Sequence, residues 1–571
     1  MATLLKRFDN FVLKKRNRIM LYVIPQAFYL LWLFFCHGLY YVTCDDVVIN
    51  SMAAGGWGEP TQYLCVESPI LGYLTQLLFR ICPDINWLGV IYIGLMIAGA
   101  VMIDIILAEK EGSFLGTCLM SVIAWNCCFL LWSYFTFTIV SYTCAISGML
   151  WCMEAVKRKQ YIPQMLPGML LLTFGMLIRA TSVYSLIIVI GFYAVYELLF
   201  KKNWRLMLLS ILIVAEVNIV KQADLMLNAQ SHIQTEYRIW NSARSAVGDY
   251  LTPEQFAENG NFSDADVQAF YGAFLWDREL YSSEKMQEVK AVNMPELRKN
   301  NFFQFYLEFV NIWEDLTGWN NYYSFYFILF LIILLFEIFS RNGRLREILL
   351  VCAGALSTRF LFFVLGRMVY RVLMPGYLFA ILCILCMSEK FWRKNRPVMV
   401  YLTAILVMDI FLLRAFYVSQ TGTDWVYEKS NYKVLEYLSE NKDKLFLPCT
   451  GIAYSLEMAK TVPEFKGKDY ISNLIGNWNI YSDRYYKFLE SYDICNPDRL
   501  VLDLPDSDVI RLVITGGQEL PDYIIEFIEE RTSLKVSAEL EESIVGTGYG
   551  DWNIYSIHTT ADESGKRSAY D

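Results

Sequence analysis

Two adjacent carboxylates, Asp45 and Asp46, lie in the stretch TCDDVVINSMAAGGWGEP, directly after the first long apolar run. A carboxylate at such an edge can take a proton from a hydroxyl group, which is the task of a general base. It can also cap the helix that VVINSMAAG predicts, because aspartate is a preferred N-cap residue. Position alone favours the capping interpretation, so the catalytic one depends on which groups surround the pair.

Arginine side chains supply the opposite charge along the same predicted edge. The planar guanidinium fork matches the oxygens of a phosphate group. A single arginine at this depth more often anchors a helix end while its charged head stays in water. Several of them on one side, together with the two aspartates, favour a site for a phosphorylated ligand. The candidate phosphate ligands are Arg179, Arg238, Arg244, Arg367 and Arg371.

Four further residues are candidate auxiliary side chains. His37 lies on the last turns of the first apolar run, and Trp57 and Glu59 follow the two aspartates. Arg359 falls well inside an apolar run, where a charge is costly unless it meets an acid such as Asp104 or lines a polar cavity. The cysteines show no metal-ligand spacing. Whether the protein uses a divalent cation is left open.

The elements that must position these residues are apolar helices. The chain has 571 residues, of which 55% are hydrophobic and 19% charged, and its mean hydropathy is +0.33. It divides repeatedly into apolar runs of about twenty residues, which is the length that crosses a bilayer. We therefore expect an α-helical polytopic membrane protein. About eleven transmembrane helices are predicted, at 19–43, 87–108, 114–133, 137–156, 164–180, 183–200, 206–222, 322–340, 347–366, 372–389 and 398–416.

Basic clusters recur at every second turn between the predicted spans, which is the pattern of cytoplasmic loops. They are LKKRNR, KRK, KKNWR, RNGRLR and EKFWRKNR, whereas EKEG at 109–112 is not basic. We therefore expect a multi-pass protein of the plasma membrane with a cytoplasmic N-terminus. Loops 44–86 and 223–321 and the tail from 417 then lie on the extracytoplasmic side.

The chain divides into two predicted domains, a transmembrane part at 1–416 and an extracytoplasmic α/β domain at 417–571. Residues 421–571 contain 27 acidic and 15 basic residues, so their net charge is −12 against −9 for the whole chain. Four segments of this tail predict strands: KLFLP, RLVLDL, VIRLVI and LKVSAEL. In the loops, PILGYLTQLLF predicts a helix on the membrane surface, and LTPEQF predicts a helix that begins with a capping box.

This pattern resembles the GT-C class of membrane glycosyltransferases, such as bacterial O-antigen glucosyltransferases and protein mannosyltransferases. The stretch CDDVVINSMAAGGWGEP is the most specific part of the resemblance, and GMLIRATSVYS and GRMVYRVLMPGY are similar to arginine-bearing segments near outer helix ends. The resemblance implies a polyprenyl-phosphate-linked sugar as donor and a first-loop acid as catalytic residue. Carried over to this chain, that role falls on Asp45 or Asp46.

The expected reaction is inverting transfer of a sugar to a cell-envelope glycan or a lipid-linked acceptor. Phosphate is a good leaving group, so a base and cations suffice, unlike the carboxylate pair of glycoside hydrolases. We expect membrane lipids as further partners and no nucleic acid. Two other functions remain open: a ligase or polymerase of lipid-linked polymers, and a transporter or flippase of envelope precursors. A transporter should carry its charges on broken helices at mid-membrane.

Overall fold

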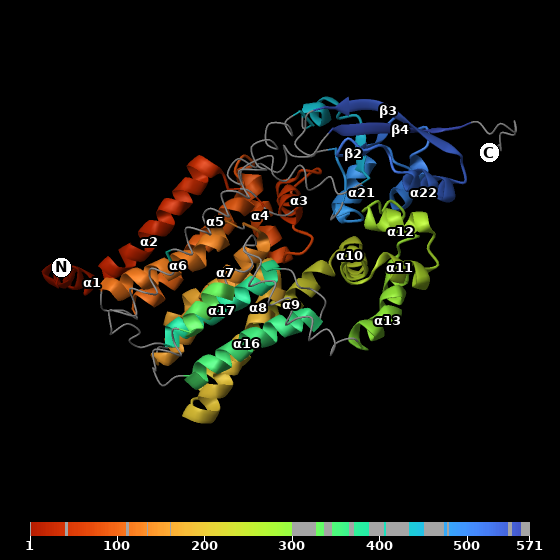
Figure 1. The fold of residues 1–571 in the computed structure, drawn as a ribbon. Coiled ribbons are helices and arrows are strands. Elements are labelled where there is room, and N and C mark those ends of the chain that lie inside the picture. Colours follow the sequence, from red (N-terminus) through yellow and green to blue (C-terminus); the bar gives the residue numbers. More distant parts are fainter. Residues whose placement is uncertain are drawn as a thin grey trace.

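The computed structural model describes residues 2–39, 41, 44–109, 114–133, 135–159, 162–299, 327–335, 345–364, 370–387, 405–406, 433–434, 436–449, 473–476, 479–545 and 551–560. These residues are mostly helical, with one small sheet near the C-terminus. In Figure 1 the long apolar helices run side by side as a bundle, and the sheet lies beyond one end of it. We call that end, which carries α3 (Cys44–Ala54), α4 (Pro69–Ile81) and α10 (His232–Tyr250), the capped end. The opposite end, which carries Lys15, Arg158 and Lys201, is the basic end.

Five helices of the bundle are long and apolar enough to cross a membrane: Lys15–Cys36, Trp87–Ala108, Phe137–Lys157, Pro163–Lys201 and Arg205–Asn228. The predicted span at 398–416 lies outside the described residues apart from 405–406, and the span at 322–340 is described only over 327–335. The named helices of the bundle are α1 (Ala2–Val12), α2 (Lys15–Trp32), η1 (Leu33–His37), α5 (Trp87–Ala108), α6 (Phe114–Ser133), α7 (Phe137–Lys157), α8 (Ile162–Lys201), α9 (Arg205–Asn228), α16 (Leu345–Val364) and α17 (Tyr370–Met387).

The first bundle helix ends earlier than the predicted span at 19–43. Its last turn is the π-helical η1, and Gly38 follows with a φ of 91°, which a glycine adopts without a steric penalty. A separate helix, α3 (Cys44–Ala54), begins at Cys44 with both aspartates in its first turn. The aspartates therefore lie on a new helix rather than on the end of the first span.

Helix α8 contains the two predicted spans at 164–180 and 183–200. At Arg179 the backbone leaves the helical region, with φ −158° and ψ 95°. The chain reverses there, because the two halves meet α7 in opposite order. The contacts with α7 are Ser141 to Gly175 (2.8 Å) and Cys152 to Met165 (3.8 Å) for the first half, and Tyr142 to Ser185 (3.0 Å) and Lys157 to the Tyr193 ring centroid (5.3 Å) for the second.

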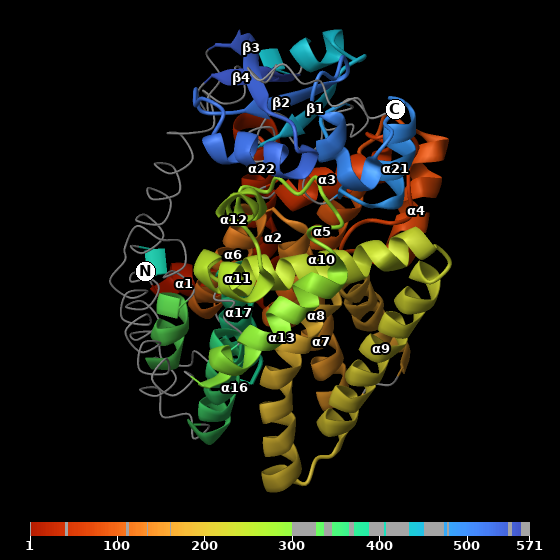
Figure 2. The ribbon, with the colours of Figure 1, turned by 90° about the vertical axis from the view of Figure 1, so that its right-hand side faces the viewer.

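Short helices cover the capped end. They are α4 (Pro69–Ile81), α10 (His232–Tyr250), α11 (Pro253–Gly260), α12 (Asp264–Tyr271) and α13 (Ser283–Lys299). Helix α4 is the predicted surface helix: Leu71 and Phe79 are buried, whereas Leu77 and Ile81 on the other side are exposed. The predicted capping box of α11 is confirmed, because Thr252 and Gln255 bond each other's backbone N–H groups. Figure 2 shows α10 lying across the end of the bundle, between the bundle helices and the sheet.

The C-terminal sheet has four strands in the order β1-β2-β4-β3. Strands β1 (Leu445–Pro448) and β2 (Ile510–Ile514) are parallel, and β4 (Trp552–Thr559) is antiparallel to β2 and to β3 (Val536–Ile544). Helices α21 (Asp483–Glu490) and α22 (Asp522–Thr532) accompany it. The strand predicted from RLVLDL is wrong: these residues form the 3-10 helix η3 (Pro497–Asp503), where the Asp503 carboxylate accepts bonds from Asn496.

The described parts of the first loop, the long loop and the tail pack together at the capped end. Trp57 of the first loop donates a hydrogen bond to the Leu474 carbonyl, 3.1 Å away. The long loop meets the tail through a backbone bond of 3.1 Å from Val501 to Trp276. These bonds make the three segments one cap over the bundle, so the polar mass of the described chain is concentrated at a single end.

Candidate active site

Asp46 is buried and binds the first residue of α7. Its Oδ1 atom accepts the backbone N–H of Phe137 at 2.6 Å, and only 1% of the residue is exposed. A carboxylate at the N-terminus of a helix is stabilised by the free N–H groups and by the helix dipole. Asp46 therefore holds α3 against α7, which gives one of the two aspartates a positioning role.

Asp45, its neighbour, is partly exposed and lies close to two other polar side chains. Burial raises the pKa of the Cys65 thiol to about 12, and the negative charge of Asp45 contributes to that rise. The same charge contributes to the raised pKa of the Tyr237 phenol, whose main cause is again burial. Asp45 thus lies between the first loop and α10, at the junction of cap and bundle.

Arg244 brings a positive charge to this junction from α10. It opposes the rise in the pKa of both Cys65 and Tyr237, which requires it to lie near both groups. Arg244 and Tyr237 are seven residues apart on one helix, which is about two turns, so they share a face. The Arg244 guanidinium donates to the Asn241 side chain at 2.9 Å and lies 5.7 Å from the Trp240 ring centroid.

Arg179 lies at the reversal of α8, beside the N-terminus of α7. Its Nη1 donates to the Thr138 hydroxyl at 2.5 Å, and its guanidinium lies 5.2 Å from the Phe137 ring centroid. Asp46 binds the N–H of the same Phe137. The start of α7 therefore brings Arg179 and Asp46 into one neighbourhood, as expected for two residues predicted at the same membrane edge.

Glu67 is an acid of this cluster that sequence reasoning missed. It is buried, and the Tyr92 hydroxyl of α5 donates a hydrogen bond to it. Burial raises the pKa of Glu67 to about 8, and the charge of Asp46 contributes to the rise. The only signal in the sequence is a single glutamate inside the otherwise apolar stretch LCVESPIL, which also suits a solvated turn.

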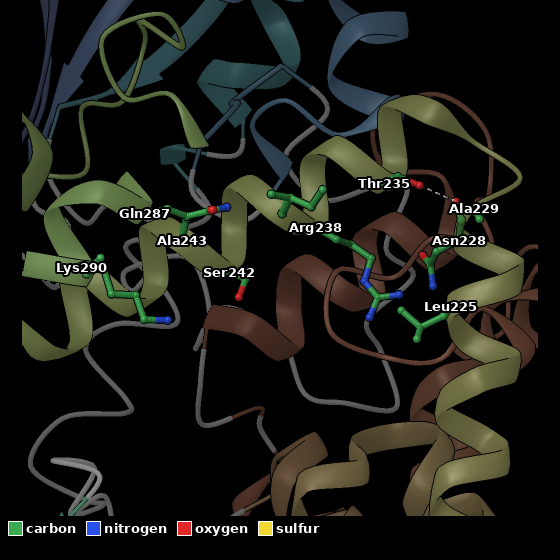
Figure 3. A pocket seen from close by; sticks show the side chains of 11 residues that line it. Leu225, Asn228, Ala229, Thr235, Arg238, Ser242, Ala243, Gln287 and Lys290 are labelled. Atoms are coloured by element: carbon green, nitrogen blue, oxygen red, sulfur yellow. Dashed lines mark hydrogen bonds between the residues drawn. The ribbon is translucent and has the colours of Figure 1, made fainter. Parts of the chain in front are cut away.

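Arg238 does not point into this cluster. It follows Tyr237 directly, so its side chain leaves α10 in a different direction. It lines a separate cavity of about 760 Å³ between α9, α10 and α13, shown in Figure 3. Burial lowers the pKa of Arg238, an effect that the nearby charge of Asp224 opposes.

The remaining candidates lie elsewhere. Trp57 is buried and bonds the tail, while Glu59 is exposed. Arg371 lies in the first turn of α17, His37 is the last residue of η1, and Arg367 lies outside the described residues.

The two charges predicted inside the membrane have separate hydrogen-bonding partners. Arg359 is buried and donates to the Tyr377 hydroxyl at 3.0 Å. Asp104 instead accepts a bond of 2.7 Å from Gln26. Each charge thus has a neutral hydrogen-bonding partner in the bundle.

No protein-family model, curated protein or solved structure significantly matches the chain. Within the described part of the chain, no three His, Cys, Asp or Glu side chains form a group that could hold a metal ion. The interpretation of the site therefore rests on its own geometry and on the resemblance seen in the sequence.

Proposed function

We propose that the protein is an integral membrane glycosyltransferase of the GT-C type. It transfers a sugar from a polyprenyl-phosphate donor to a glycan or lipid-linked acceptor of the cell envelope. The observation that carries this proposal is the pair of aspartates at the start of α3: Asp46 is fixed to α7, whereas Asp45 is partly exposed beside Arg244. Asp45 is the more exposed of the two carboxylates, which supports its choice as the group that meets an acceptor.

Asp45 acts as the base in this proposal. It takes the proton of the acceptor hydroxyl while that oxygen attacks the anomeric carbon of the sugar. The bond from the anomeric carbon to the phosphate oxygen breaks, and the electron pair leaves with polyprenyl phosphate. A single displacement of this kind inverts the anomeric centre, and no general acid is needed because phosphate leaves as a stable anion.

Arg244 and Arg179 stabilise the departing phosphate. Both lie at the capped end, near Asp45 and Asp46 respectively. Fixed cations in a site with little water stabilise developing negative charge without having to reorganise. The basic clusters at the opposite end of the bundle support a cytoplasmic location for that end and an extracytoplasmic site.

The test is sugar transfer by the full chain in lipid vesicles that contain polyprenyl-phosphate-linked hexoses. Asp45→Asn keeps the shape of the side chain and removes the base, so the rate should fall roughly 100-fold or more. Donor binding should survive. The matched control is Asp84→Asn, the same change at an exposed position of the same loop, and it should keep the rate.

Asp46→Asn distinguishes a catalytic role of Asp46 from a structural one. An asparagine oxygen can still accept the Phe137 N–H, so this variant should fold and lose less activity than Asp45→Asn. If Asp45→Asn and Asp46→Asn both fold, bind donor and transfer sugar at the wild-type rate, the proposed function of this loop is wrong.

A further inference from the structure

The cavity between α9, α10 and α13 contains two cations that the proposed reaction does not use. Arg238 comes from α10 and Lys290 from α13, and the cavity measures about 760 Å³. This is within the range of pockets that hold small ligands. The polar residues that line it are Asn228, Thr235, Arg238, Ser242, Gln287 and Lys290.

Neither cation is neutralised by an ion pair within the described part of the chain. Arg238 is half-buried, yet its guanidinium makes no hydrogen bond or ion pair with a described residue, and neither does the Lys290 ammonium. Asp224 on α9 interacts with Arg238 electrostatically, but the Asp224 carboxylate accepts its hydrogen bond from Ser68. A partly buried guanidinium without hydrogen-bond acceptors is costly, so the site favours an anion.

The two cations line the same cavity. In Figure 3 the side chains of Arg238 and Lys290 extend to the same side of α10, with Ser242 between them. A guanidinium fork, an ammonium and a hydroxyl that line one cavity offer several donors to the oxygens of a phosphate.

The surroundings of the cavity favour a lipid over a soluble anion. The cavity lies at the last turn of α9, which is one of the five helices able to cross a membrane. Leu225 and Ile239 line it and are nearly half exposed, and the adjacent Met226 is 71% exposed. A cationic pocket beside an apolar surface at a helix end suits a head group whose chains enter the bilayer.

We infer that this cavity binds the phosphate of a membrane lipid, with Arg238 and Lys290 as its cationic ligands. The lipid is either a phospholipid of the bilayer or a polyprenyl phosphate, which share the phosphate and the hydrocarbon chains. This inference does not rest on the proposed reaction, because binding at the cavity requires no sugar transfer and none of the residues at Asp45.

The test is lipid titration of the detergent-solubilised full chain, followed by native mass spectrometry. The probes are polyprenyl phosphate, phosphatidylglycerol and diacylglycerol, which lacks a phosphate. Arg238→Gln and Lys290→Gln should each weaken binding of the phosphate lipids about tenfold, the usual scale for losing one charge-assisted hydrogen bond. Lys285→Gln is the matched control, because Lys285 is exposed on α13 and does not line the cavity.

Ser242→Trp gives an independent test that leaves both cations in place. Ser242 is exposed, so the larger side chain should be accommodated while it fills the space between Arg238 and Lys290. It should block the phosphate lipids even if the charge variants fail to fold.

The outcomes separate the two lipid sources and can overturn the inference. Preference for polyprenyl phosphate over phosphatidylglycerol identifies a carrier site, and equal binding identifies a phospholipid site. Three outcomes would show that no lipid-phosphate site exists there. The first is equal retention of diacylglycerol, and the second is displacement by inorganic phosphate at the concentration of the lipid. The third is wild-type binding by the folded Arg238→Gln, Lys290→Gln and Ser242→Trp variants.

Discussion

At the basic end of the bundle, cations meet carboxylates. Lys201 lies 2.7 Å from Glu197 and 2.8 Å from Glu347, and Lys15 pairs with Glu109. The last pair also explains why EKEG interrupts the basic pattern of the other turns: its glutamate binds a cation from the N-terminal cluster. Opposite charges in contact largely cancel each other's field.

At the capped end, charged residues around α3 make hydrogen bonds to neutral groups. Asp46 accepts a backbone N–H, Arg179 donates to a hydroxyl and Arg244 donates to an amide. Glu67 accepts a bond from a tyrosine. A charge held by neutral dipoles keeps its field and can act on charge that develops in a substrate. The two ends therefore differ in how their charges are held: by ion pairs at the basic end, and partly by neutral hydrogen-bonding groups around α3.

The largest expected effect is the pH dependence of stability that Glu67 contributes. Its pKa is raised to about 8 in the folded chain, against a usual value of 4.5, so the folded state holds the proton more tightly. The contribution of Glu67 to stability is fully present below its pKa in the unfolded chain. As the pH rises from there to its pKa in the folded chain, the free energy of unfolding falls by about 1.4 kcal/mol per pH unit. The Gln side chain of Glu67→Gln stays neutral at every pH. In unfolding experiments from pH 5 to pH 9, the free energy of unfolding of this variant should therefore rise relative to that of the wild type.

An unchanged pH slope in Glu67→Gln would show that Glu67 is not a buried neutral acid, which would remove one difference between the capped end and the ion-paired basic end. Asp84→Asn serves as the control, because an exposed carboxylate in the same loop should leave the slope as it is.

Asp46→Ala should destabilise the fold by about 1–3 kcal/mol, because it leaves the buried N–H of Phe137 without an acceptor. Asp46→Asn can keep that bond and should cost less. Chemical unfolding of the two variants measures the difference. Equal stability of Asp46→Ala and the wild type would contradict the positioning role of Asp46.

Arg244→Lys and Arg179→Lys should each reduce the rate of sugar transfer roughly tenfold, since lysine keeps the charge but loses the planar fork. Arg158→Lys, at the basic end, should leave the rate unchanged, because Arg158 binds Glu109 and Glu154 far from the proposed site. Rates in the vesicle assay provide the comparison. Full activity of both Arg244→Lys and Arg179→Lys would remove the proposed phosphate ligands from the reaction.

The smallest effect is expected from Glu109→Gln. Its ion-pair partners Lys15 and Arg158 are 49% and 37% exposed, and pairs in contact with water contribute about 0–1 kcal/mol. Unfolding of this variant should therefore differ little from the wild type. A loss as large as that of Asp46→Ala would mean that the two ends do not differ in the way described.

Local features of the fold could be predicted from the sequence because they depend on neighbouring residues. Apolar runs predicted the bundle helices, and the Thr252 and Gln255 pair predicted the start of α11. The strands β1, β2 and β3 followed from apolar runs, but β4 was missed. RLVLDL has a strand pattern and nevertheless forms η3, because Pro497 begins a helical turn that Asp503 closes onto Asn496.

By itself, the sequence determined that the chain forms apolar helices with an acidic tail, and it showed the two aspartates following the first apolar run. Only the tertiary structure decided what surrounds them, because the N–H that binds Asp46 lies 91 positions away on α7. It also paired Glu67 with Tyr92 and directed Arg238 and Arg244 to different neighbours of α10. Hydropathy shows which residues leave water, but only packing determines which distant groups meet when they do.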